Sequence, residues 1–221
     1  GVTQSLVDAF FMQNGLPIDN PSAGHKEEGF STQKVTLNNT IWDEEVNGGA
    51  ITYENTYNMY CNREPRFYVS VAFNNSYFPT EKRLFDFFNG AADNTHTHDA
   101  PQNGYLIRKR VSPKTNVKEK NYQYRPGIVY RLGEAYLNYA EALNEYKNDY
   151  TSRQEALSYV NKIRERAGIR PYTLEAVDPA VAQKIHVDDT QEAVRKVIRA
   201  ERRVELCGEG IRYDGKKQKA H

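Results

Sequence analysis

The sequence predicts a mainly α-helical fold, in which a helical hairpin and further helices follow an irregular region with short strands. Residues 20–126 are rich in Asn, Gly, Pro and aromatic residues, whereas residues 127–207 show helical periodicity almost without a break. The chain of 221 residues is long enough to bury a large core. We therefore expect one domain, with a loop-rich half at 1–126 and a helical half at 127–213.

Composition and charge exclude several classes of protein. Lys and Arg number 30 against 29 Asp and Glu, and the net charge of +1 is too small to attract nucleic acid or an anionic membrane. No stretch approaches the roughly 18 continuous apolar residues of a membrane-spanning helix. Cys61 and Cys207 have neither the number nor the spacing of a disulfide framework or a zinc site.

The loop-rich half contains a few local patterns. Apolar residues between Leu6 and Met12 predict a short helix that ends near Gly15. Aromatic and aliphatic residues alternate with others from Phe67 to Phe73, which is typical of a strand packed on one face. A second extended run is expected from Tyr105 to Val111.

The helical half begins with an amphipathic helix that has one apolar stripe and an opposite polar face. The apolar stripe consists of Ile128, Leu132, Ala135, Tyr136, Tyr139, Ala140 and Leu143. The polar face consists of Arg131, Glu134, Asn138, Glu141 and Glu145. We expect the apolar stripe to be the packed side.

A second helix follows after a short polar turn. Ser152 and Glu155 can satisfy the exposed amide groups at its start, and Gly168 ends it. Two helices joined by a short turn lie antiparallel, and their small residues resemble one tetratricopeptide-like hairpin. One such hairpin cannot bury its own face, so other segments must cover it.

The last helix is expected from Asp189, as its cap, to Leu206. Its apolar spacing places Glu201 in the middle of the packed side, with Glu205 beside it. A buried carboxylate without a partner costs several kcal/mol, so arginine partners are expected. A catalytic acid is the alternative, but arginines would keep the carboxylate ionised. The candidate partners are Arg202 and Arg203 on the same helix and Arg131 and Arg164 on the hairpin.

Aromatic residues are concentrated from Tyr53 to Phe88, with Trp42 just before. Such rings form either a core, as expected for Phe67 and Phe73, or a platform for the flat faces of sugars. Asn, Asp, Gln or Arg groups would then bind the hydroxyl edges. The candidate rings are Trp42, Tyr53, Tyr57, Tyr77 and Phe78, and the candidate edge partners are Asp43, Asn74, Asn75 and Asn94.

Little in the sequence indicates catalysis. His96, His98 and Asp99 form a compact cluster that could chelate zinc in a hydrolase, although such residues are also common in solvated loops. No nucleophile elbow, phosphate-binding glycine loop or dinucleotide fingerprint is found. We therefore expect neither a metal nor a cofactor.

Several stretches form a set of motifs in a fixed order. They are NGLPI at 14–18, NREPRF at 62–67, YRLGEAYLNYAEALNE at 130–145, RAG at 166–168, IRAERRVEL at 198–206 and EGIRY at 209–213. Together they resemble the SusD/RagB family of nutrient-binding outer-membrane lipoproteins of Bacteroidetes. The resemblance covers most of the chain.

The resemblance implies a SusD-like α-α superhelix and a non-catalytic role. It further implies a glycan or other nutrient as ligand, bound by loops of the first half, and a SusC-like TonB-dependent transporter as partner. The full-length protein would be lipid-anchored on the external face of the outer membrane. A tetratricopeptide-like interaction module with no small-molecule site is the alternative.

Three features depart from the family pattern. The lipobox cysteine and the N-terminal helical repeats are absent, so we expect the chain to begin within a longer protein. Gly133 stands where alanine or a larger residue is usual, which could loosen its helix by about 1 kcal/mol. Residues 214–221 replace the aromatic continuation that is usual after this motif.

Overall fold

The computed structural model describes residues 2–36, 49–88, 90–94, 101, 103–178 and 181–210. Its helices are α1 (Gln4–Val7), the 3-10 helix η2 (Asn58–Tyr60), α3 (Pro65–Ser70), α4 (Leu132–Tyr146), α5 (Tyr150–Arg166) and α6 (Gln191–Glu205). Its strands are β1 (Val71–Ala72), β2 (Tyr77–Phe78), β3 (Arg83–Leu84), β4 (Leu106–Ile107), β5 (Tyr172–Thr173) and β6 (Ile185–His186). The predicted mainly α-helical fold with short strands is confirmed. Within the described ranges, no helix has the length and apolar character needed to span a membrane.

The chain divides into two compact units. The first comprises Gly1–Val7, Gly24–Arg63 and Phe67–Pro126, and the second comprises Asp8–Ala23, Glu64–Arg66 and Gly127–His221. The change in composition at residue 126 therefore coincides with a boundary between units. Two short segments that precede this boundary in the chain nevertheless belong to the helical unit.

The first unit is held together by aromatic packing and two small antiparallel sheets. Strand β1 pairs with β4, and β2 pairs with β3. Phe67 and Phe73 are buried, as expected, and their stacked rings lie 5.3 Å apart between centroids. Tyr60 adds a ring 4.7 Å from that of Phe73. The rings stabilise short strands that a few ladder hydrogen bonds alone would not hold.

The strand expected from Phe67 to Phe73 is wrong for most of its length. Residues 65–70 form α3, and only Val71 and Ala72 continue as a strand. Pro65 stands at the first helical position, where its fixed φ and missing N–H favour a helix. Phe67 and Tyr68 are both buried although they are adjacent, which an alternating strand would not allow.

The expected helix from Leu6 to Met12 is also corrected, because α1 already ends at Val7. Beyond it, Phe11 bonds to Glu64 instead of continuing the helix. The Phe11 N–H donates to the Glu64 carboxylate at 3.0 Å, and the Glu64 N–H donates to the Phe11 carbonyl at 3.0 Å. This long-range bridge outweighs the local helical pattern.

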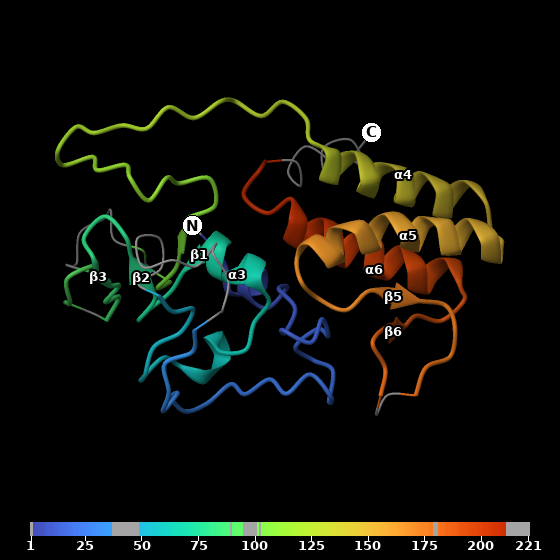
Figure 1. The fold of residues 1–221 in the computed structure, drawn as a ribbon, viewed down its shortest axis with the longest axis horizontal. Helices are drawn as coiled ribbons and strands as arrows, with labels where there is room; N and C mark the ends of the chain where they lie inside the picture. Colours follow the sequence, from blue (N-terminus) through green and yellow to red (C-terminus); the bar gives the residue numbers. More distant parts are fainter. Residues whose placement is uncertain are drawn as a thin grey trace. The chain divides into compact units, whose positions relative to one another are not determined.

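The second unit contains a bundle of three helices, α4, α5 and α6, in which each helix contacts the other two (Figure 1). Helices α4 and α5 form the predicted antiparallel hairpin, and the parallel pair β5 and β6 packs beside it. The shared core includes Ala140 of α4, Leu157 and Val160 of α5, and Val194 and Ile198 of α6. These apolar residues recur every three or four positions, which explains the predicted helices.

The helix caps differ from the expected ones. Asp149, not Ser152, caps α5, and its carboxylate accepts from the Ser152 N–H at 2.8 Å. Thr190, not Asp189, caps α6, with its hydroxyl accepting from the Ala193 N–H at 3.1 Å. Asp189 instead accepts a hydrogen bond from Arg153 at 2.6 Å. A tertiary ion pair has thus displaced a local cap.

Helix α4 is rotated relative to the expectation. Its buried residues are Gly133, Leu137, Ala140 and Asn144, whereas Leu132 and Tyr139 of the predicted apolar stripe are exposed. The predicted polar face turns toward α6. Ion pairs join Arg131 to Glu205, Glu141 to Arg202 and Glu145 to Arg195. In this orientation part of the predicted apolar stripe is left uncovered.

Gly133 lies where α4 approaches the Arg131–Glu205 pair. A Cβ atom at this position would lie 2.6 Å from Nη1 of Arg131 and 3.1 Å from Oε1 of Glu205. The glycine therefore makes room for the ion pair at the start of the helix. Its cost in helix propensity is offset by the pairing that it permits.

We expect Gly133→Ala to lower the free energy of unfolding by about 1–2 kcal/mol. Alanine favours the helix by about 1 kcal/mol, but displacing a guanidinium from a mostly buried carboxylate costs more. Urea unfolding followed by circular dichroism measures the change. In an Arg131→Ala background the same substitution should stabilise the protein. A single variant as stable as the wild type would contradict the role assigned to Gly133.

Candidate functional site

Glu201 lies in the interior of the helical unit and is paired with two arginines. Its side chain is fully buried, with Nη1 of Arg66 2.6 Å from Oε1 and Nη1 of Arg164 3.0 Å from Oε2. Arg164 is itself fully buried and also donates to the carbonyls of Gly15 and Arg170. Both carboxylate oxygens thus receive a charge-assisted hydrogen bond, as a buried charge requires.

Glu205, one helical turn later, continues the same network. Its carboxylate accepts from Arg131 at 2.5 Å, from Arg166 at 2.5 Å and from Arg66 at 3.1 Å. Burial alone would raise the pKa of Glu205, but the hydrogen bonds from Arg166 and Arg131 outweigh it and lower the pKa to about 2. Glu205 is therefore ionised at neutral pH.

Glu64 contacts Arg66 through a different nitrogen, and burial has the larger effect on its pKa. Its carboxylate lies 2.6 Å from Nε of Arg66 and is fully buried. Burial raises the pKa of Glu64, although the charge of Arg66 acts in the opposite direction. Arg66 therefore pairs with three buried carboxylates, those of Glu64, Glu201 and Glu205.

Two of the four arginines that the sequence suggested as partners do pair with the buried glutamates of α6. Arg164 binds Glu201, and Arg131 binds Glu205. Arg202 instead points to Asn138 and Glu141, and neither it nor Arg203 is a partner of Glu201. Sequence reasoning missed Arg66, which lies 135 positions from Glu201. Only its place in the NREPRF motif, beside Glu64, singles it out.

The candidate aromatic rings lie half-buried in the first unit. Tyr57 packs its ring 5.5 Å from Phe30 and 6.0 Å from Tyr60. Phe78 stacks on Phe85 at 4.4 Å and belongs to a small apolar cluster. Tyr53 and Tyr77 are likewise half-buried. Trp42, Asp43, His96, His98 and Asp99 lie outside the described residues.

The three candidate asparagines with described positions are engaged in holding loops. Asn74 accepts from the Phe87 N–H at 2.7 Å. Asn75 donates to the carbonyl of Glu54 at 2.9 Å and has a positive φ of 69°, which asparagine tolerates. Asn94 donates to the Phe87 carbonyl at 3.2 Å. These bonds use part of the polar capacity that the sequence assigned to a ligand.

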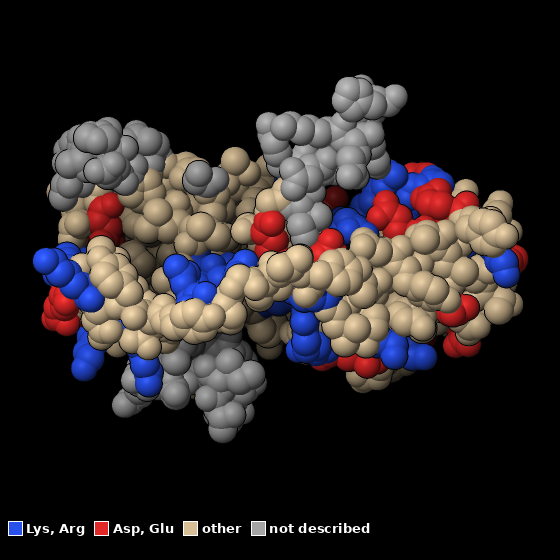
Figure 2. All heavy atoms as spheres, turned by 90° about the horizontal axis from the view of Figure 1, so that it is seen from above, with Lys and Arg blue, Asp and Glu red and all other residues tan. Residues whose placement is uncertain are grey.

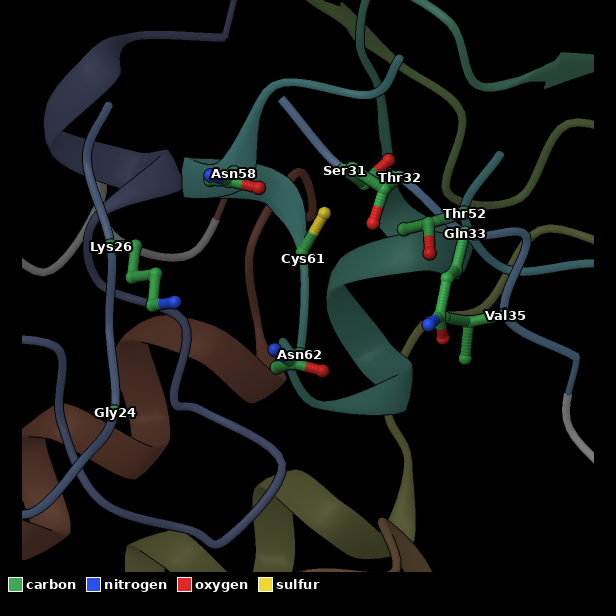
Figure 3. A pocket seen from close by; sticks show the side chains of 10 residues that line it. All are labelled: Gly24, Lys26, Ser31, Thr32, Gln33, Val35, Thr52, Asn58, Cys61 and Asn62. Carbon is green, nitrogen blue, oxygen red and sulfur yellow. The ribbon is translucent and has the colours of Figure 1, made fainter. Parts of the chain in front are cut away.

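A polar pocket that sequence reasoning did not predict lies elsewhere in the first unit. It encloses about 370 Å³ and is lined by Gly24, Lys26, Ser31, Thr32, Gln33, Val35, Thr52, Asn58, Cys61 and Asn62. Lys26 stands on one side and Gln33 and Val35 on the other, with Cys61 and Asn62 between them (Figure 3). All of these residues belong to one compact unit.

Two chain segments build the walls of this pocket. The segment 30–35 pairs with 51–57 through bridges at Phe30 and Tyr57 and at Val35 and Thr52. The Ser31 hydroxyl donates to the carbonyl of Tyr53 at 2.7 Å, and Asn58 donates to the carbonyl of Glu28 at 2.8 Å. No periodic pattern marks these residues, which is why the sequence did not predict the pocket.

The pocket offers a thiol, hydroxyls and amides. Burial raises the pKa of the Cys61 thiol, which keeps it protonated and weakly nucleophilic. The neutral amides and hydroxyls of Gln33, Thr32 and Asn62 can donate and accept hydrogen bonds. Among the described residues, no group of three or more His, Cys, Asp or Glu side chains could hold a metal ion.

The chain belongs to the SusD family, whose sequence profile matches residues 1–215. A solved SusD-like protein from Bacteroides fragilis is 27% identical to it with a TM-score of 0.59, and the match covers 95% of this chain and 34% of that one. The protein BT4246, solved in selenomethionine form, is 26% identical with a TM-score of 0.60, and the match covers 92% of this chain and 32% of that one. The chain thus spans about a third of these structures. Among curated proteins, no significant match was found.

We expect Glu201→Gln to lower the free energy of unfolding by about 3 kcal/mol, because two buried arginines lose their shared counter-charge. Thermal and urea unfolding measure the loss. Glu145→Gln is a matched control, since Glu145 is partly exposed and pairs with Arg195 at the surface, where ion pairs contribute little. Equal stability of Glu201→Gln and the wild type would refute the structural role.

Acid should weaken the network through Glu205. Its folded-state pKa of about 2 lies below the usual 4.5, so its contribution is present above pH 4.5 and is lost as pH falls toward 2. The stability difference between the wild type and Glu205→Gln should therefore shrink by about 2 kcal/mol between pH 7 and pH 3. Urea unfolding at both pH values tests this. A difference that stays constant or grows in acid would contradict it.

Proposed function

We propose that this chain is the part of a SusD-type protein that captures a glycan, and that it does so without catalysis. The observation that carries the proposal is the polar pocket of the first unit, which lies next along the chain to the ring pair Phe30 and Tyr57. Membership of the SusD family is a second, separate support for a nutrient-binding role.

The pocket suits the surface of a sugar. Sugars present flat C–H faces, which pack on aromatic rings, and hydroxyl edges, which bind amides and hydroxyls. Phe30 is 59% exposed and offers such a ring. Within the described residues, the side chains of Thr32, Gln33 and Asn62 make no hydrogen bond to another residue and can meet the hydroxyl edges.

The proposed ligand, partner and cellular location are those that the family resemblance implies. The proposed ligand is an oligo- or polysaccharide or another nutrient, and the proposed partner is a SusC-like TonB-dependent transporter that receives it. The proposed location is the external face of the outer membrane, with a lipid anchor on the full-length protein. Tyr53, Tyr77, Phe78 and the residues Trp42 and Asp43 stay further candidates for ligand contacts.

The second candidate function is protein interaction through the helical hairpin. Leu132, Ala135, Tyr139, Ala142 and Tyr146 follow one another at spacings of three and four on α4. Leu132 and Tyr146 are well exposed, at 63% and 81%. Figure 2 shows a largely uncharged area over the helical unit, bordered by charges of both signs. This spacing is typical of a face that packs on another helix.

We expect Phe30→Ala and Tyr57→Ala each to weaken glycan binding by about 1 kcal/mol or more, because stacking area is lost. A glycan array identifies the ligand, and isothermal titration calorimetry measures each variant. Tyr146→Ala removes an equally large ring from α4 and should leave the affinity unchanged. Melting curves confirm that each variant is folded.

Three outcomes would count against the proposal. Binding of no glycan, together with loss of a protein partner in Tyr146→Ala, would favour the interaction module. Normal binding by both pocket-side variants would place the platform elsewhere. Cleavage of a bound polysaccharide, abolished by a point mutation in this chain, would show an enzyme.

A further inference from the structure

The pocket of the first unit contains one unbalanced charge. Of its ten lining residues, Lys26 alone is charged, and no carboxylate is among them. The amino group of Lys26 points toward the side of the pocket that holds Cys61 and Asn62 (Figure 3). No ion pair or hydrogen bond joins the Lys26 side chain to any other residue that the structure describes.

Some other charged side chains of the same unit are held in ion pairs. Arg83 holds Asp93 through two hydrogen bonds of 2.7 Å, and Lys118 lies 2.9 Å from Glu81. Glu27 and Glu28 directly follow Lys26 in the sequence but do not line the pocket. The positive charge at Lys26 is therefore available to a molecule that enters the pocket.

Two groups can be distinguished among the lining side chains. Ser31 and Asn58 are committed to the walls through bonds to the carbonyls of Tyr53 and Glu28. Lys26, Gln33 and Asn62 make no such bonds within the described part of the chain. The second group offers one cation and two neutral amides, which together match an anionic group flanked by hydroxyls.

We propose that the pocket selects an acidic sugar, with Lys26 binding its anionic group and Gln33 and Asn62 its hydroxyls. This inference rests on the proposed glycan capture and adds the class of glycan. A carboxylate of a uronic acid and a sulfate ester share the required charge. A neutral sugar would leave the Lys26 charge without a partner and would gain nothing from it.

The test is a binding panel in three arms: neutral, uronate-bearing and sulfated oligosaccharides on one array. We expect the wild type to bind the uronate-bearing or the sulfated oligosaccharides. Comparing its affinities for these two arms identifies the anionic group. Lys26→Gln should weaken binding to the best acidic oligosaccharide by about tenfold at low salt. Its affinity should also lose most of its dependence on ionic strength.

Lys118→Gln is the matched control, because it removes the same charge from the same unit at an exposed ion pair away from the pocket. Its affinity should stay within about twofold of the wild type. Melting curves of both variants exclude unfolding as the cause. Equal losses in the two variants would indicate a diffuse charge effect and overturn the assignment to Lys26.

Failure of this inference differs from failure of the proposed function. Binding confined to neutral oligosaccharides, or acidic binding that is unchanged in Lys26→Gln, overturns the acidic-sugar assignment and leaves glycan capture standing. Binding to none of the three arms overturns both.

Discussion

The pairing of two buried carboxylates on α6 with arginines is the constraint on which the helical unit depends. Glu201 is fully buried, and its two partners, Arg66 and Arg164, come from distant parts of the chain. Because an unpaired buried charge costs several kcal/mol, the core closes only when these segments are in place. The unit is accordingly assembled from residues 8–23, 64–66 and 127–221. Gly15, with a positive φ of 80°, brings its carbonyl against Arg164, where a Cβ atom would meet Nη2 at 2.6 Å.

The same network joins the start of α4 to the end of α6. Arg131 reaches both Glu205 and Glu209, and Gly133 leaves the space that this approach needs. Charge pairing with α6 and the packing of Leu137 and Ala140 therefore act together on the rotation of the helix. The consequence is an exposed row of leucine, alanine and tyrosine side chains that the three-helix bundle does not cover.

The sequence predicted the three long helices because each repeats apolar residues every three or four positions over at least 15 residues. It predicted a buried, arginine-paired Glu201 for the same reason. It could not predict Arg66, since no local pattern connects positions 66 and 201, nor the caps, where Arg153 draws Asp189 away. The β propensity of Phe67 and Tyr68 predicts a strand, but residues 65–70 form a helix because the packing of these two rings outweighs that propensity.

The candidate site was less predictable than the fold because loops build it. Aromatic content pointed to the unit that also contains the pocket, but half-buried rings such as Phe78 mostly pack on their neighbours. The pocket instead arises from the register of 30–35 against 51–57, which places polar side chains such as Gln33 around a cavity without any repeating spacing. Its side chains that make no internal bonds lie outside the apolar cores of both units. Substitutions among them should therefore cost little stability, which suits the ligand recognition that we propose for the pocket.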